Sequence, residues 1–434
     1  MRSIERQKFI VSIFILLSVC SGNLLAQSQD SLSLKIGQMI LIGFPGEQVD
    51  TLVLGEIRAG KVGSIIMFEK NVPGSAVSLA AQKKNIPWSS ASFTSLKKIL
   101  WTYQKAATIP LLVTIDQEGG KVNRLKPKYG FSRSITAQEM GKSHSLDSVW
   151  FYAESTAATL AGLGINVNFA PVVDLGVNKE NTVIYKVGRS FSANPDSVAL
   201  LAEEFIKPHR RFGVITALKH FPGHGSSTAD THVGVADVTN TWTAAELVPY
   251  ERLIANGSID AVMSAHIVNK KLDPTGLPGT LSKRILDSLL RKQMHFDGVI
   301  FSDDMQMQAI AREYGLEEAI RLSINAGIDI LCFSNNIQGS EERTVDKVHG
   351  IIRSLVEKGQ IQPERIDQSF RRIMKLKKQI KLPGSEPVEK QRAVKRESGE
   401  PMDSTAVKQN VPANEQPAPQ DKEQRRKKKK KKSE

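Results

Sequence analysis

Short apolar segments alternate with longer amphipathic segments along most of the chain. Each apolar segment is rich in β-branched residues and is followed by polar or glycine-rich residues and then by a helical pattern of apolar positions. Several, such as Leu111–Ile115, are apolar at nearly every position, which is typical of parallel strands buried on both faces. The predicted strands are Ile36–Phe44, Val62–Phe68, Pro110–Ile115, Ile165–Val173, Val214–Lys219, Ala261–His266, Gly298–Ser302 and Ile328–Phe333.

Predicted helices lie between these strands, for example Val149–Gly162, Asp196–Arg211 and Leu316–Ala326. Eight alternating strand and helix units predict an α/β fold, a single (β/α)8 TIM-type barrel. The same alternation leaves a doubly wound open sheet as the alternative.

Polar and ionisable residues follow the predicted strands at their carboxyl ends. One such residue could simply cap the next helix, but several together indicate a shared site, and barrel enzymes build their active sites at this face. The gathering therefore favours the barrel over the open sheet. The residues are Asp116-Gln117-Glu118, Asp174, Lys219-His220, His266, Asp303-Asp304 and Asn335.

The first 26 residues have the pattern of an export signal. A basic start precedes the apolar run Phe9–Leu17, and the small residue Ala26 stands at the expected cleavage point. The run is too short to span a membrane comfortably. We expect the protein to be exported to the periplasm. Secretion, a lipid anchor on Cys20 and an uncleaved membrane anchor remain as alternatives.

Residues 27–381 are predicted to form the barrel domain, and residues 382–434 a disordered tail. The tail is rich in Pro, Glu, Gln and Lys and includes the basic run Arg425–Lys432. That run allows weak electrostatic contact with an anionic polymer or a membrane. The chain carries a net charge of +14, but outside the tail the excess is spread along the sequence. No nucleic-acid partner is therefore expected, and a nucleic-acid-binding protein is the weakest alternative.

The segment from Lys219 to His232 carries the candidate chemistry. It reads Lys-His-Phe-Pro-Gly-His-Gly-Ser-Ser-Thr-Ala-Asp-Thr-His and begins at the end of a predicted strand. Histidine clusters bind zinc, but this spacing offers no helical histidine pair with an acidic third ligand, so no metal is expected. Asp230 and His232 flank one residue. A turn can bring this carboxylate and imidazole together as a tuned acid/base pair.

The same segment closely resembles the signature of family 3 glycoside hydrolases of the β-N-acetylglucosaminidase branch. Further matches to that family follow in the expected order, and the resemblance spans roughly Leu34 to Leu376. These matches are Asp116-Gln117-Glu118-Gly119-Gly120 with Arg124, Asn168–Asp174, Gly188-Arg189-Ser190-Phe191, Ser264-Ala265-His266 and Phe301–Met305.

The resemblance implies an exo-acting, retaining β-N-acetylhexosaminidase that needs no cofactor. Its substrates would be peptidoglycan-type or chitin-type glycans that end in β-linked N-acetylglucosamine. Asp303 would be the nucleophile that forms a covalent glycosyl-aspartate intermediate, His232 the acid/base and Asp230 its partner. Asp304 and His224 would be structural. The side chains that would hold the sugar are Asp116, Arg124, Arg189, Lys219 and His220.

A histidine is chemically suited to this role. Retaining hydrolysis ordinarily uses two carboxyl groups, one as nucleophile and one as acid/base. An imidazole titrates near neutrality, so it can protonate the leaving oxygen in one step and activate water in the next.

The sequence departs from the family pattern in two mild ways. Thr231 stands between the dyad residues where the family usually has serine, and Met305-Gln306-Met307 replaces Leu-Ser-Met. Neither departure removes a reacting group. The polar stretch after the barrel does not read as the second α/β domain of family 3 β-glucosidases, which supplies a glutamate acid/base. This favours the branch that uses the histidine loop.

Two other functions are compatible with the same motifs. A glycoside phosphorylase is one, because a neutral histidine does not repel an incoming phosphate. A catalytically silent glycan-binding barrel is the other, although the presence of Asp303, Asp230 and His232 argues against it. The sequence does not specify the natural glycan.

Overall fold

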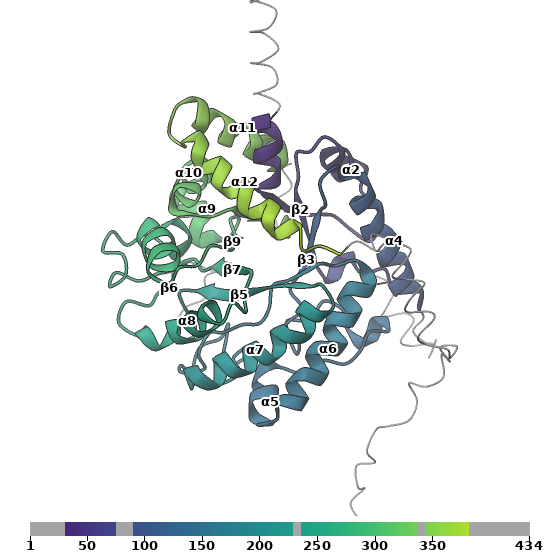
Figure 1. Ribbon diagram of the computed structural model, residues 1–434, viewed down its shortest axis with the longest axis vertical. Coiled ribbons are helices and arrows are strands. Elements are labelled where there is room, and N and C mark those ends of the chain that lie inside the picture. Colours follow the sequence, from purple (N-terminus) through teal and green to yellow (C-terminus); the bar gives the residue numbers. More distant parts are fainter. Residues whose placement is uncertain (1–30, 75–89, 229–235, 337–343, 382–434) are drawn as a thin grey trace, which may run out of the picture. The chain divides into compact units, whose positions relative to one another are not determined.

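The computed structural model describes residues 31–74, 90–228, 236–336 and 344–381 (Figure 1). The predicted signal peptide, the predicted tail, and Asp230, Thr231 and His232 lie outside these residues. The domain boundaries at 26 and 381 therefore stay predictions. Within the described part of the chain, no helix has both the length and the apolar character needed to span a membrane.

In the described residues, eight parallel strands form a closed barrel, which confirms the predicted fold (Figure 1). Because β1 pairs with both β2 and β10, the sheet has no free edge, and the open-sheet alternative is excluded. Each predicted strand overlaps one observed strand. Around the barrel the order is β1 (Ile40–Gly43), β10 (Ile330–Phe333), β9 (Val299–Asp304), β7 (Ala261–Ser264), β5 (Ile215–Phe221), β4 (Val167–Asn168), β3 (Leu112–Ile115) and β2 (Ser64–Met67).

Helices surround the strands (Figure 1). Their bounds include the three helical segments given above as examples. The α-helices of the described residues are α2 (Thr51–Arg58), α4 (Ser90–Ala106), α5 (Ala137–Lys142), α6 (Leu146–Leu163), α7 (Pro195–Arg211), α8 (Val248–Ala255), α9 (Gln308–Tyr314), α10 (Leu316–Ala326), α11 (Thr344–Glu357) and α12 (Pro363–Lys377), and a π-helix, η5, spans Arg284–Gln293. A parallel pair of two-residue strands, β6 (Ala236–Asp237) and β8 (Ile267–Val268), lies outside the barrel and was not predicted.

Local sequence sets the ends of the helices α6 and α7. The Ser145 hydroxyl accepts the Ser148 amide at the start of α6, and Gly164 ends that helix in the left-handed conformation, with φ of 86°. Asn194 caps α7 in the same way, followed by proline at the first helical position.

The barrel interior is closed by side chains beneath its carboxyl end. The rings of Phe169 and Phe301 meet edge to face with centroids 5.1 Å apart. Asp303 lies two residues beyond Phe301 on β9, nearer the mouth, where the pairing of β9 with β10 is irregular. The aromatic pair thus lies beneath the end of β9 that carries this carboxylate.

At the amino end of the barrel, α12 is fastened by buried charges. Asp329 is fully buried and forms ion pairs with Arg291 at 2.5 Å and with Arg365 at 3.3 Å. Ser369 of α12 donates to the same carboxylate at 2.7 Å. Lys377, also buried, donates to the carbonyl oxygen of Gly63 at 2.8 Å. These contacts hold the last described helix against the strands from below.

Candidate active site

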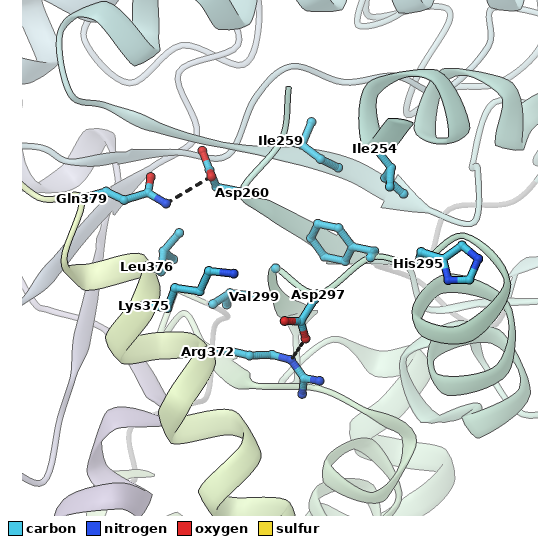
Figure 2. A pocket seen from close by; sticks show the side chains of 12 residues that line it. Ile254, Ile259, Asp260, His295, Asp297, Val299, Arg372, Lys375, Leu376 and Gln379 are labelled. Carbon is cyan, nitrogen blue, oxygen red and sulfur yellow. Dashed lines mark hydrogen bonds and ion pairs between the residues drawn. The ribbon is translucent and has the colours of Figure 1, made fainter. Parts of the chain in front are cut away.

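Hollows lie at both ends of the barrel. At the amino ends of the strands, one of about 200 Å³ is bordered by Arg210, Val214 and Lys381. Another, of about 190 Å³, lies at the amino ends of β7 and β9 beside α12 (Figure 2), where Arg372 donates to Asp297 at 2.9 Å and Gln379 donates to Asp260 at 3.2 Å. A further hollow lies at the carboxyl ends of the strands, where barrel enzymes place their chemistry, and this one is the candidate active site.

The cavity at the carboxyl ends has a volume of about 340 Å³. It brings together Asp303 and all five predicted sugar-binding side chains. Its charged and polar lining comprises Asp116, Glu118, Arg124, Arg189, Lys219, His220, Asp303, Asp304, Ser334 and Asn336. Its apolar lining includes Phe68, Phe169, Met263 and Met307.

One side of the cavity is a network of ion pairs centred on Lys219. The Lys219 ammonium lies 2.7 Å from a carboxylate oxygen of Asp116 and 2.7 Å from one of Glu118. Arg189 donates to both oxygens of Glu118, at 2.7 and 2.8 Å. Arg124 reaches Asp116 at 3.2 Å. The network holds each side chain in one orientation before any ligand is present.

The network also fixes the charges of its acids. Burial opposes ionisation of Asp116, but Lys219 and Arg124 outweigh it and hold the pKa of Asp116 well below its usual value. Burial also opposes ionisation of Glu118. The positive charges of Arg189 and Lys219 outweigh burial and lower the pKa of Glu118 to about 2. The pKa of Arg189 is raised, because its acidic neighbours outweigh the effect of burial. Both carboxylates are therefore ionised at neutral pH.

Exposure separates the groups that can touch a ligand from those that support them. The side chains of Lys219 and Glu118 are 2% and 5% exposed, whereas Asp116 is 16% and Arg124 25% exposed. Asp116 and Arg124 thus present an acceptor and a donor to the cavity. Lys219 and Glu118 lie beneath them and hold them in place.

Arg124 is positioned from two directions. The Gln117 side-chain oxygen accepts the backbone amides of Arg124 at 3.0 Å and Leu125 at 3.1 Å, which shapes the turn. The Arg124 guanidinium lies over the Phe68 ring, 5.5 Å from its centroid. The aromatic ring covers one face of the cation and leaves its edge for ligand oxygens.

His220 is fixed by partners on both ring nitrogens. Arg189 donates to its Nε2 at 3.2 Å, and because a guanidinium only donates, Nε2 must be the acceptor. The proton is therefore on Nδ1, which donates to Asp174 at 2.7 Å. These two hydrogen bonds correspond to the Nδ1–H tautomer of the ring. The imidazole presents its ring to the cavity and holds Arg189, rather than offering a free nitrogen.

The two adjacent aspartates at the end of β9 have different surroundings. Asp304 accepts the backbone amides of Gln306 at 3.1 Å and Ser334 at 3.2 Å, and the Ser334 hydroxyl as well. Through these contacts Asp304 joins the end of β9 to the residues that follow β10. His266 supports the same point, since its Nε2 lies 2.9 Å from the Asp304 carbonyl oxygen. Asp303 accepts the Asp304 amide at 2.8 Å and borders the cavity.

Two acids beside the predicted residues belong to the site and had no role assigned from the sequence. Glu118 is part of the Asp-Gln-Glu motif, and Asp174 follows β4 at the barrel mouth, so position at a strand end was the signal for both. Asp230 and His232, the predicted acid/base pair, are among the residues the structure does not describe. In the described part of the chain, no group of three or more His, Cys, Asp or Glu is arranged to hold a metal ion.

Comparison with known proteins identifies the family. Residues 31–376 match the model of the glycosyl hydrolase family 3 N-terminal domain. A beta-hexosaminidase from Tolumonas auensis is 32% identical over 306 residues, which cover 69% of this chain and 84% of that protein. A beta-hexosaminidase from Haemophilus ducreyi is 31% identical, with 69% and 82% of the two chains covered.

Solved structures agree with this assignment. A glycoside hydrolase family 3 β-N-acetylglucosaminidase from a Paenibacillus species superposes with a TM-score of 0.70 at 31% identity, covering 84% of this chain and 67% of that one. A β-N-acetylhexosaminidase from Beutenbergia cavernae gives 0.66 at 27% identity, over 80% and 98% of the two chains. The chain described here therefore belongs to glycosyl hydrolase family 3 and is a glycosidase.

Proposed function

We propose that this glycosidase is an exo-acting, retaining β-N-acetylhexosaminidase that removes terminal β-linked N-acetylglucosamine from peptidoglycan-type or chitin-type glycans. The observation that carries the proposal is the cavity at the barrel mouth, where Asp303 borders the same space as Asp116 and Arg124. The names of the related proteins, beta-hexosaminidase and β-N-acetylglucosaminidase, support the choice of sugar.

In the proposed reaction, Asp303 attacks the anomeric carbon as the leaving oxygen takes a proton from His232. The C1–O bond breaks and an ester forms between the sugar and Asp303. Water then attacks the same carbon, gives its proton to His232, and releases Asp303 as a carboxylate. Asp230 would favour the protonated form of His232.

The remaining side chains would orient the sugar. Asp116 accepts from hydroxyl groups, while Arg124 and Arg189 donate to hydroxyl or acetamido oxygens. Lys219 acts beneath them by holding Asp116. His220 contributes through its ring and through its bond to Arg189. Because the ion pairs exist before binding, little ordering entropy remains to be lost when the sugar enters.

The proposed location is the periplasm, after export directed by residues 1–26. Protease protection of the full-length protein in intact and osmotically shocked cells tests this. Protein that remains in the cytoplasm would overturn the proposal for location and leave that for the reaction unaffected.

The reaction is tested with protein that lacks residues 1–26 and with aryl β-N-acetylglucosaminide as substrate. We expect chromophore release, its loss in Asp303→Ala and a large reduction in His232→Ala, with the aryl β-glucoside as the comparison sugar. Glu317→Ala serves as the control, because Glu317 is exposed and does not line the cavity. Turnover of neither sugar by folded protein would overturn the hydrolase proposal.

Running the assay with and without inorganic phosphate separates hydrolysis from phosphorolysis. Free sugar as the product in both cases supports a hydrolase. Formation of the sugar 1-phosphate would make the enzyme a phosphorylase.

A further inference from the structure

The segment Pro222–Ser227, here called the loop stem, leaves β5 and leads along the chain toward Asp230 and His232. Its backbone is held by side chains at almost every residue. The Trp242 indole donates to the Pro222 carbonyl oxygen at 3.0 Å. Asn181 donates to the His224 carbonyl oxygen at 2.9 Å, and Asp174 accepts the His224 amide at 2.7 Å. The stem is thus built as a rigid part of the barrel mouth.

Glu246 completes this arrangement from below. It lies in the short helix η3 (Ala244–Leu247) and is 1% exposed. One of its oxygens accepts the Ser226 amide at 2.9 Å, and the other accepts the Leu175 amide at 3.1 Å. The Gly225 amide is a third donor. A single side chain therefore ties the stem to the chain that follows Asp174.

Close packing leaves the stem no room to shift toward Glu246. A Cβ placed on Gly223 would come within 2.5 Å of the Cβ of Glu246, and one on Gly225 within 1.9 Å of the Leu175 carbonyl oxygen. Backbone approaches of this kind require glycine. The stem, Glu246 and the segment after β4 are consequently packed as one body.

The surroundings of Glu246 oppose its ionisation. Burial and the nearby Asp174 carboxylate raise the pKa of Glu246 to about 8, against the backbone amides, which lower it. A buried acid next to a second acid adds nothing to packing that an apolar side chain could not supply. Its distinctive contribution is the set of oxygens that accept backbone amides from the stem.

We propose that Glu246 is a positioning residue for the general acid/base, and that it acts by fixing the backbone of the loop stem from which Asp230 and His232 follow. Asp230 is three residues beyond Ser227 in the sequence, so the stem leads directly into the segment that carries the dyad. Asp303 lies at the end of β9, and Asp116 and Arg124 follow β3. Lys219 and His220 precede the stem on β5, where Asp116 and Asp174 hold their side chains. Loss of Glu246 should therefore weaken proton donation more than it weakens the contacts to the nucleophile and the sugar. This inference rests on the proposed function, in which His232 protonates the leaving oxygen.

The test compares two aryl β-N-acetylglucosaminides that differ in their need for protonation. A phenyl leaving group requires general acid assistance, whereas a dinitrophenyl group departs without it. General acid catalysis is worth roughly 10²–10⁴-fold. For Glu246→Ala we expect kcat/KM to fall about 50-fold or more on the phenyl substrate and by less than about 5-fold on the dinitrophenyl substrate. Glu246→Gln, which keeps one accepting oxygen, should lie between wild type and Glu246→Ala.

The controls separate positioning from general damage. Glu251→Ala removes an exposed carboxylate five residues further along the chain and should leave both rates unchanged. Circular dichroism establishes that each variant is folded. If Glu246→Ala does not fold, Glu246→Gln and Trp242→Phe are compared in its place and should show the same preference to a smaller degree. Trp242→Phe removes the indole N–H that is bonded to Pro222, together with part of the buried ring.

Equal losses on the two substrates would overturn the proposal, because they would mean that Glu246 supports the whole site. No loss on either would overturn it as well. A wild-type protein that hydrolyses neither substrate would instead overturn the proposed function, so the two failures are distinguishable.

Discussion

Glu118 offers a direct test of how the ion-pair network stabilises the barrel mouth. A pKa near 2, against an ordinary 4.5, means that the folded protein favours the carboxylate over the neutral acid by about 3 kcal/mol. The group is almost fully buried, so solvent screens this energy little. Glu118→Gln keeps the shape and removes the charge. We expect the free energy of unfolding of the variant to be about 3 kcal/mol lower than that of wild type at pH 7.

The sign of the pH dependence follows from the lowered pKa. The stabilisation is complete above the pKa of the unfolded chain and is lost as pH falls toward 2. The difference between wild type and Glu118→Gln should therefore shrink to about 1 kcal/mol at pH 3. Urea denaturation followed by circular dichroism at the two pH values measures it, with Glu317→Gln at an exposed site as the control. Equal stability of Glu118→Gln and wild type at pH 7 would refute the reasoning.

Three further predictions concern packing and buried charge. Gly225→Ala places a methyl group against the Leu175 carbonyl oxygen and should lower the unfolding free energy by about 1–3 kcal/mol, whereas Gly350→Ala, which meets nothing within 4 Å, should not lower it. Burial lowers the pKa of Lys377 to about 7, so the unfolded chain binds more protons above that pH, and wild-type stability should gain up to about 1.4 kcal/mol per pH unit between 7 and 9. That gain should be absent in Lys377→Met; an unchanged slope would contradict it. Asp329→Asn should cost about 3–5 kcal/mol in urea unfolding, because it leaves buried arginines without their partner; a loss below 1 kcal/mol would contradict the role given to that acid.

The barrel could be predicted because its strands are buried on both faces and therefore apolar almost throughout, as in Leu111–Ile115. Strand ends were harder. β5 runs on to Phe221 and β9 to Asp304, beyond their predicted ends, because polar side chains such as His220 are buried there and hydrogen-bonded. A hydropathy pattern scores such residues as exposed.

The candidate site likewise contains residues that could be predicted from the sequence and residues that could not. Residues within family motifs could be assigned roles in advance, because the resemblance supplied them. Glu246 could not, since its partners are backbone amides of residues about 20 and 71 positions away, and a backbone amide leaves no mark on the sequence. The tautomer of His220 also depended on Arg189, which only the folded chain brings to it.

The pairing of β1 with β10 has a consequence for biosynthesis. Gly43 and Asn335, which are hydrogen-bonded at this seam, lie 292 positions apart in the chain. Until the ribosome has released β10, the emerging polypeptide has two unpaired sheet edges, which can pair with other chains. Contacts of such long separation also form slowly. A sheet that closes only when β10 has been made leaves its strand edges exposed for most of the synthesis of the chain, which favours aggregation.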